Sequence, residues 1–449
     1  MEGSWAERRD AGRQLRKVVP RSSHADWSGP VHGRDPIDVL ENQAASRLPD
    51  LVPIRYARMA ESPFGFLRGA AAVMARDLST TPATGLNVQA CGDAHIRNFG
   101  HFATPERNLA FSINDFDETL PAPWEWDVKR LTASLHLVAH QHGFVPAVCR
   151  EMVTEAVRAY REDMAHYATM ATLELWYDRT DVDDVVSHFP GRYQSRVKRD
   201  MKKAQKRDPS GAVAKLTHDP GGDHQFAEDP PLIIHLDRTG HDMDEVEAML
   251  DAYRSTLRDD RAALLDRFHI ADVARKVVGV GSVGTRVWVC LFEGSSGRED
   301  DHMILQVKEA QTSVLAPYVG GLGFDHQGRR VVAGQRVTQG PTDIFLGWCE
   351  GPRTGRQYYV RQLWDAKGRS DLTRMGRREL TLHGSLCAYA LARAHARTGD
   401  PVQISGYLGS SDAFDEAIAT FAERYAATTL QDHAALVAAV TDGRVTAQL

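Results

Sequence analysis

The sequence has few cysteines, and none of them is spaced as in a zinc site or a disulfide framework. The five cysteines are scattered along the chain and never form a C-x-x-C pair, which disfavours both structures. No run approaches about 18 consecutive apolar residues, so we expect no membrane-spanning helix. Residues 1–23 are charged and contain no apolar stretch, so we expect no signal peptide. We therefore predict a cytoplasmic protein without a membrane partner.

The chain also lacks a strong excess of charge of either sign. Its net charge is −6, and 25% of its residues are charged while 42% are hydrophobic. This composition is typical of a globular protein that is large enough to bury a sizeable core. The mild acidity gives no reason to expect non-specific binding to nucleic acid, so we predict no such partner. The sequence gives no indication of an oligomeric state.

The hydrophobic pattern divides the chain into polar, helical and β-rich parts. Residues 1–50 are polar and basic and predict an arm with little structure of its own. Residues 51–270 predict a mainly helical region with a charged insertion at 186–230. Residues 271–363 predict a β-rich block, and residues 364–449 return to helix. Together these parts predict an α+β protein.

Individual elements can be expected from the periodicity. Helical patterns lie at residues 62–78, 124–142, 148–176, 243–267, 378–398 and 414–440. Short alternating runs predict strands at residues 86–90 and 109–113. Residues 192–207 carry eight Lys or Arg residues, which are typical of a solvated helix face. The alternative is a clamp for a phosphorylated or acidic substrate.

Residues 279–284 read GVGSVG, a G-x-G-x-x-G motif whose meaning depends on its flanks. A dinucleotide-binding motif opens a helix, but here both flanks are β-branched and typical of strands. A glycine-rich loop between two antiparallel strands is how protein kinases cover ATP phosphates, because glycine lets backbone N–H groups approach the anion. We therefore predict nucleotide contacts at Gly279, Gly281, Ser282 and Gly284, with a plain glycine turn as the alternative. The chain has no Walker-type G-x-x-x-x-G-K-[ST] motif.

Lys308 ends a third short apolar strand, predicted at residues 303–307. An unpaired buried ammonium is costly, so a lysine at this position needs a partner. In kinases the corresponding position holds the lysine that pairs with the nucleotide phosphates. The alternative is an edge-strand lysine that points to solvent. The acidic partner stays open, since the adjacent Glu309 should point to the opposite face of the sheet.

Two polar segments in the N-terminal half carry the residue types of phosphoryl transfer. Residues 91–98 read CGDAHIRN, and residues 114–118 read NDFDE after a predicted hairpin. A carboxylate can position and deprotonate an attacking hydroxyl, while an amide oxygen and a second carboxylate can hold Mg²⁺. The segments resemble the catalytic and metal-binding loops of aminoglycoside phosphotransferases and choline kinases. The resemblance implies a catalytic loop with Asp93 as base and His95 beside it, and Mg²⁺ ligands at Asn98, Asp115 and Asp117.

The same resemblance extends to residues 124–127, which read WEWD and begin an apolar helix. In the small-molecule kinases an aspartate at this position braces the catalytic loop, which implies that role for Asp127. The alternative is a first-turn acid that interacts with the helix dipole. We expect Trp124 and Trp126 to lie in the core. Cys91 stands where those families have histidine, which leaves the internal bracing of the loop open.

Six short motifs extend over nearly the whole chain, from about Asp35 onward. They are RGA at 68–70, CGDAH at 91–95, NDFDET at 114–119, WEWD at 124–127, GSVGT at 281–285 and QVKEA at 306–310. Together they resemble the bacterial family catalogued as domain of unknown function 2252. That name supplies no activity.

The order of the motifs differs from that of a kinase, because Asp93 and Asp115 precede Gly281 and Lys308. A circular permutation would explain this order. We therefore predict a two-lobed protein-kinase-like fold with permuted motifs, a β-rich nucleotide lobe and a larger helical lobe. In that fold Lys308 and Asp115 should face each other within roughly 10 Å. The glycine-rich segment should lie above them, with Asp93 and Asn98 below.

The predicted function is an ATP- and Mg²⁺-dependent phosphotransferase that acts on an unidentified hydroxyl acceptor, either a small molecule or a protein. One alternative is a metal-dependent hydrolase that uses Asp93, His95, Asp115 and Asp117, which would leave Lys308 unexplained. Two others keep the kinase-like fold: a nucleotide-binding pseudokinase, and an enzyme that transfers AMP.

Overall fold

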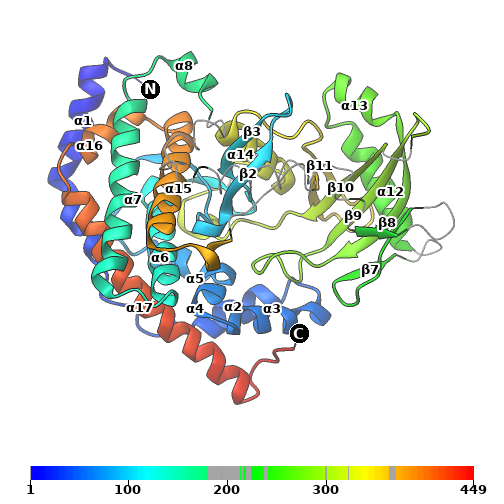
Figure 1. Cartoon of the computed structure of the whole chain (residues 1–449), viewed down its shortest axis with the longest axis horizontal. Coiled ribbons are helices and arrows are strands. Elements are labelled where there is room, and N and C mark those ends of the chain that lie inside the picture. The colour runs from blue at the N-terminus through cyan, green and yellow to red at the C-terminus, as the bar shows by residue number, and fades with distance from the viewer. Residues whose placement is uncertain are drawn as a thin grey trace.

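The chain folds into a helical body and an antiparallel sheet, as the α+β prediction requires (Figure 1). The computed structural model describes residues 2–179, 194, 213, 216–218, 224–236, 241–298, 301–321, 323–363 and 371–448. The helices are α1 (Trp5–Val18), α2 (Pro36–Ala44), α3 (Val52–Ala60), α4 (Pro63–Gly69), α5 (Ala71–Leu78), α6 (Trp124–Gln141), α7 (Pro146–Tyr167), α8 (Thr172–Tyr177), α12 (His241–Arg254), α13 (Asp259–Leu265), α14 (Gln327–Gln339), α15 (Arg377–Thr398), α16 (Pro401–Leu408) and α17 (Ala413–Thr441).

Within the described ranges, the main sheet has six strands in the order β11-β12-β10-β9-β8-β7, and every neighbouring pair is antiparallel. Its strands are β7 (Ile233–His235), β8 (Phe268–Lys276), β9 (Val287–Gly294), β10 (His302–Glu309), β11 (Gly347–Glu350) and β12 (Gln357–Gln362). Three two-stranded ribbons pair β1 (Asn87–Ala90) with β4 (Leu120–Pro123), β2 (Phe99–Ala103) with β3 (Leu109–Ile113), and β5 (Thr217–His218) with β6 (Gln225–Phe226). Because β10 lies inside the sheet, the edge-strand alternative for Lys308 is wrong.

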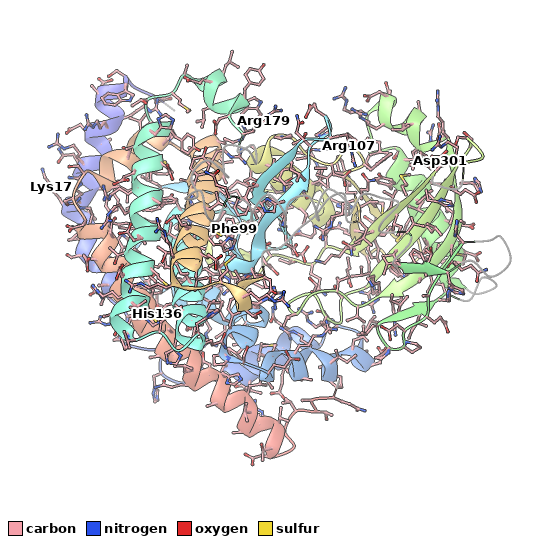
Figure 2. All side chains as sticks on the ribbon, in the orientation of Figure 1. Lys17, Phe99, Arg107, His136, Arg179 and Asp301 are labelled. Carbon is pink, nitrogen blue, oxygen red and sulfur yellow. The ribbon has the colours of Figure 1, made fainter. Side chains whose placement is uncertain are left out.

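The helical body takes its helices from both ends of the chain. Helix α7 packs along α15, and α17 packs against α6 and α7. Their shared core includes Leu135 of α6, Leu391 of α15 and Phe421 of α17, each at 0% exposure. In Figure 2, side chains surround Phe99 at the start of β2, whereas Lys17 of α1 lies at the periphery. Trp124 and Trp126 are buried in this core, as predicted.

The prediction of an arm with little structure at residues 1–50 is wrong, because this part of the chain forms α1 and α2. Helix α1 crosses α16 so closely that a Cβ at Gly12 would lie 2.1 Å from the carbonyl oxygen of Gln403. Arg8 forms a salt bridge of 2.6 Å with Asp400. Gly12 and Arg8 make these contacts, and Leu15 of α1 packs against the core. A single leucine does not form the apolar stripe that usually predicts a docked helix.

Most predicted elements are confirmed with small shifts in their ends. The helices at 124–142, 378–398 and 414–440 are α6, α15 and α17, and the strands at 86–90 and 109–113 are β1 and β3. The pattern at 148–176 gives α7 and α8, and that at 243–267 gives α12 and α13. The helix predicted at 62–78 is instead two helices, because Ala70 leaves the helical conformation with φ −108° and ψ 36°.

Two further expectations concern the whole chain. No helix within the described ranges is long and apolar enough to cross a membrane. All five cysteines are buried and free. The basic residues of segment 192–207 lie outside the described residues, and so do residues 364–370, which follow Leu363.

Candidate active site

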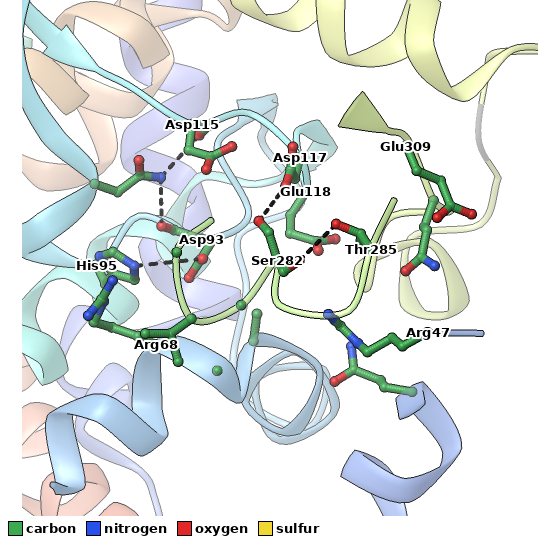
Figure 3. A pocket seen from close by; sticks show the side chains of 18 residues that line it. Arg47, Arg68, Asp93, His95, Asp115, Asp117, Glu118, Ser282, Thr285 and Glu309 are labelled. Carbon is green, nitrogen blue, oxygen red and sulfur yellow. Dashed lines mark hydrogen bonds and ion pairs between the residues drawn. The ribbon is translucent and has the colours of Figure 1, made fainter. Parts of the chain in front are cut away.

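The residues predicted for chemistry come together in one pocket (Figure 3). Its walls come from α2, α4 and α5, from the two polar segments of the helical body, and from the loop between β8 and β9. The predicted residues that line it are Asp93, His95, Asn98, Asp115, Asp117, Gly279, Gly281 and Ser282. Gly284 lies at the end of the glycine-rich loop and Lys308 directly behind Asp117, so neither is part of the wall itself.

The loop that carries Asp93 is held by the first turn of α6. The carboxylate of Asp127 accepts hydrogen bonds from the backbone N–H groups of Cys91, at 2.6 Å, and Gly92, at 2.9 Å. Gly92 has φ +77°, and a Cβ there would lie 2.5 Å from the carbonyl oxygen of Glu118. The bracing role implied for Asp127 is therefore present in the fold, and glycine is required at the turn.

The brace continues into the helical core. Nε2 of His395, on α15, lies 3.2 Å from a carboxylate oxygen of Asp127, and Nδ1 of the same ring lies 2.8 Å from the hydroxyl of Tyr160. Tyr160, Asp127 and His395 are at most 1% exposed. This buried chain of polar groups fixes the orientation of Asp127.

Asn98 connects the two polar segments. Its amide nitrogen donates to the carbonyl oxygens of Asp93 and Asp115, both at 3.0 Å. The thiol of Cys91 joins the same cluster, with Sγ 3.4 Å from the Asn98 nitrogen and 3.6 Å from the carbonyl oxygen of Asp115. Cys91 stands where the kinase families have histidine, and here the Cys91 thiol and the Asn98 amide together hold the catalytic-loop segment to the Asp115 segment.

The remaining oxygen of Asn98 fits the ligand role implied for it. Asn98 Oδ1 is buried and has no hydrogen-bond partner among the described residues. A buried amide oxygen without a donor, next to the Asp115 and Asp117 segment, is the kind of hard ligand that Mg²⁺ takes. Among the described residues, no three or more His, Cys, Asp or Glu side chains are grouped as in a metal centre. The described residues therefore contain no cluster that could form the carboxylate–histidine centre of a hydrolase.

Asp93 points into the pocket and is held on one side. Its Oδ1 accepts a hydrogen bond of 2.7 Å from Nε of Arg130, and its Oδ2 lies 3.8 Å from Nε2 of His95. Burial raises the pKa of the Asp93 carboxyl to about 6, while the charge of Arg130 opposes this rise. A carboxylate with a pKa near neutrality can accept a proton from a hydroxyl and release it again.

Lys308 finds its acidic partners in the second polar segment. Its side chain is 1% exposed, and its ammonium forms an ion pair with Oδ2 of Asp117 and lies 3.7 Å from Oδ2 of Asp115. The separation expected for Lys308 and Asp115, within roughly 10 Å, is confirmed. The hydroxyl of Tyr359, opposite Lys308 on β12, donates to Oδ1 of Asp117 at 2.7 Å.

Glu309 faces away from Lys308, as the alternation of a strand predicts. Its carboxylate lies 3.3 Å from the guanidinium of Arg286 and 3.3 Å from that of Arg356. Glu309 therefore pairs with the two arginines that immediately precede β9 and β12, and not with Lys308.

The glycine-rich loop connects the antiparallel strands β8 and β9, as predicted. Residues of the N-terminal helical segment bind it. Leu48 N donates to the carbonyl oxygen of Gly284 at 2.7 Å, and Arg58 donates to that of Gly279 at 2.6 Å. Val283 is 0% exposed and packs in a small cluster with Leu51 and Ile54. The N-terminal helices thus fix the loop above the pocket, where the hydroxyl of Ser282 donates to Asp117 at 3.2 Å.

The pocket also contains charged residues that the sequence interpretation did not single out: Arg47, Arg68, Glu118 and, behind Asp93, Arg130. Burial raises the pKa of Glu118 to about 7, while a hydrogen bond from Val314 N opposes the rise.

Arg130 could have been predicted from its position in the sequence. It follows Asp127 by three positions on α6, and this spacing places the two residues on one helix face. Arg68 and Glu118 lie within motifs that carry the family resemblance.

The chain matches one family of bacterial proteins. Residues 47–439 match the family described as "Uncharacterized protein conserved in bacteria (DUF2252)", which confirms the resemblance seen in the motifs. No curated protein and no solved structure matches the chain.

Proposed function

The chain belongs to the bacterial DUF2252 family, and we propose that it is a kinase-like phosphotransferase that moves a phosphoryl group from ATP to a hydroxyl acceptor. One observation carries the proposal: Lys308 of the sheet lies 3.7 Å from Asp115 of the helical body, beneath a glycine-rich loop between antiparallel strands. Phosphoryl transfer needs these parts at one place, because a lysine, a metal-binding carboxylate and glycine N–H groups all act on the same phosphates.

The order of elements supports a kinase-like lobe. The strands β8, β9 and β10 form a meander with the glycine-rich loop in its first turn and Lys308 on its third strand. Helix α14 follows β10, as a helix follows the lysine strand in kinases. The helical body, built from both ends of the chain, takes the place of the second lobe. A circular permutation of the kinase order is consistent with this arrangement.

In the proposed reaction the acceptor hydroxyl lies beside Asp93. Its oxygen attacks the γ-phosphorus of ATP, a new P–O bond forms, and the bond to the β-phosphate oxygen breaks, so that ADP leaves with the electron pair. The hydroxyl proton goes to Asp93 Oδ2, because Oδ1 is engaged by Arg130. Arg130 thus orients the carboxylate, and Lys308 pairs with the phosphates once they displace Asp117.

Asn98 Oδ1 and the carboxylates of Asp115 and Asp117 would hold Mg²⁺. When bound, the ion offsets the negative charge on the phosphate oxygens. The supporting observation is the buried oxygen of Asn98, which faces no donor among the described residues. The carboxylates of Asp115 and Asp117 add the negative charge that a divalent cation requires.

The proposal is tested by thermal-shift assays with ATP, ADP and AMP, each with and without Mg²⁺ or Mn²⁺. Incubation with γ-labelled ATP and a metabolite extract then tests the transfer itself. We expect ATP to stabilise the protein much more with a divalent cation than without one, and the label to appear on an acceptor. Stabilisation by metal without nucleotide would point to a hydrolase. Label on the acceptor only from α-labelled ATP would point to AMP transfer, and binding without any product would point to a pseudokinase.

A further inference from the structure

Helix α14 follows the lysine strand and carries a fully buried arginine. Arg330 is 0% exposed. Its guanidinium donates to three backbone carbonyls: those of Thr119 at 2.6 Å, Asp117 at 2.8 Å and Gln311 at 2.9 Å. It also donates to the side chain of Gln327 at 2.8 Å. One side chain thus joins the segment after Lys308 to the segment that contains Asp115 and Asp117.

Burial of a guanidinium among carbonyl groups is costly, and burial lowers the pKa of Arg330. Four hydrogen bonds offset this cost. The planar donor group has a fixed geometry, so it holds its acceptors at fixed relative positions, which a flexible ammonium would not do. A side chain of this kind is well suited to hold two segments in register.

Other residues of α14 contact the same part of the helical body. The side-chain amide of Gln339 donates to the carbonyl oxygen of Ile113 at 2.6 Å, one residue before the polar segment 114–118 begins. A Cβ at Gly334 would lie 2.4 Å from a methyl carbon of Thr119. The helix therefore lies directly against both ends of this segment.

We infer that Arg330 is a positioning residue, which sets the carboxylates of Asp115 and Asp117 at the distance from Lys308 that a metal-bound nucleotide requires. Lys308 takes its acidic partners from this segment, and α14 reaches the backbone of the same segment through Arg330. The inference rests on the proposed function. It adds the means by which α14 couples the sheet to the metal site.

The test compares ATP affinity with and without Mn²⁺ by calorimetry, in the wild type and in Arg330→Met. The variant keeps the bulk of the side chain and removes its donors. Lys308 and the glycine-rich loop stay in place, so affinity for metal-free ATP should not fall. The gain in affinity from Mn²⁺ should fall by about 10- to 100-fold, as is typical when the residues that orient metal ligands are lost.

Arg393→Met is the matched control, because Arg393 is a buried arginine of α15, 1% exposed, outside the pocket. It should lower thermal stability and leave the gain from Mn²⁺ unchanged. If Arg330→Met does not fold, Arg330→Lys should show a smaller loss in the same direction. An undiminished gain in a folded Arg330 variant would overturn the inference and leave the proposed function standing. A wild type without any gain from Mn²⁺ would overturn both.

Discussion

The ammonium of Lys308 lies 3.7 Å from the carboxylate of Asp115, although one belongs to β10 of the sheet and the other follows β3 in the helical body. No local contact brings them together, since α6, α7, α12, α13 and the strands β7 to β9 separate them along the chain. A cation and a carboxylate this close can both act on one phosphate group, with a metal ion on the carboxylate side.

Asp115→Asn should abolish the stabilisation by nucleotide that depends on a divalent cation. The amide keeps the size of the side chain but removes the charge that binds the cation. The measurement is a thermal shift with ATP and Mg²⁺, and Asp244→Asn is the control, because that side chain is 64% exposed and pairs with Arg353 at the surface. Undiminished stabilisation in Asp115→Asn would remove Asp115 from the metal site.

Asp93→Asn should leave ATP affinity nearly intact and lower turnover by roughly a hundredfold or more, the range for a lost general base. Because burial raises the pKa of Asp93 to about 6, the base is ionised above that pH. Wild-type turnover should therefore fall as the pH is lowered through about 6, and the variant should lose this dependence. Equal losses in nucleotide binding and in turnover would instead identify Asp93 as a metal ligand.

The sequence predicts the parts of the site whose residue types are unusual where they stand. Glycines between two strands, a lysine at the end of an apolar strand, and carboxylates after short strands are all locally conspicuous. These signals bring out Asp93, Asn98, Asp115 and Lys308, and the kinase-like resemblance relates them to one another.

The sequence does not predict the contacts that hold these parts in place. Arg47 and Arg330 bind backbone carbonyls that only the tertiary fold brings near them, and arginine side chains are usually exposed. The same reason explains the error at the N-terminus, where α1 docks through Gly12 and Arg8 without an apolar stripe. The sequence does not identify the acidic partner of Lys308, because Asp117 lies in a segment that is remote along the chain.

Asp127→Asn should destabilise the protein by about 1–3 kcal/mol, because the new amide group would face a backbone N–H that now donates to a carboxylate. The measurement is urea unfolding. Asp259→Asn is the control, since Asp259 is an exposed acid in the first turn of α13, where it interacts with the helix dipole. Equal losses in the two variants would mean that the bonds from Asp127 to Cys91 and Gly92 contribute nothing beyond the dipole.

Arg34→Met should destabilise the fold by about 3–5 kcal/mol, because it leaves two buried carboxylates without their cation. Arg34 lies 2.6 Å from Asp77 and 2.7 Å from Asp432, and these bonds join the N-terminal segment to α5 and α17. Urea unfolding measures the loss. Arg150→Met, which breaks an ion pair at the surface, should cost about 1 kcal/mol or less. A loss for Arg34→Met no larger than that would show that the buried pairs make no net contribution.

Asp117→Asn tests the state of the site before nucleotide binds. In the structure Asp117 pairs with Lys308 and accepts hydrogen bonds from Tyr359 at 2.7 Å and Ser282 at 3.2 Å, so the lysine is covered. Phosphates must displace Asp117 to reach it. Loss of the charge should therefore raise affinity for metal-free ATP by roughly fivefold, the equivalent of about 1 kcal/mol.

In the same variant the gain in ATP affinity from Mn²⁺ should be smaller than in the wild type, because a ligand of the cation is also lost. The two effects have opposite signs, and calorimetry with and without the metal separates them. Asp115→Asn is the comparison: its carboxylate lies 3.7 Å from the ammonium, whereas Asp117 makes the closer contact, so the rise in metal-free affinity should be smaller. If Asp117→Asn instead lowers affinity for metal-free ATP, Asp117 does not compete with the phosphates for Lys308.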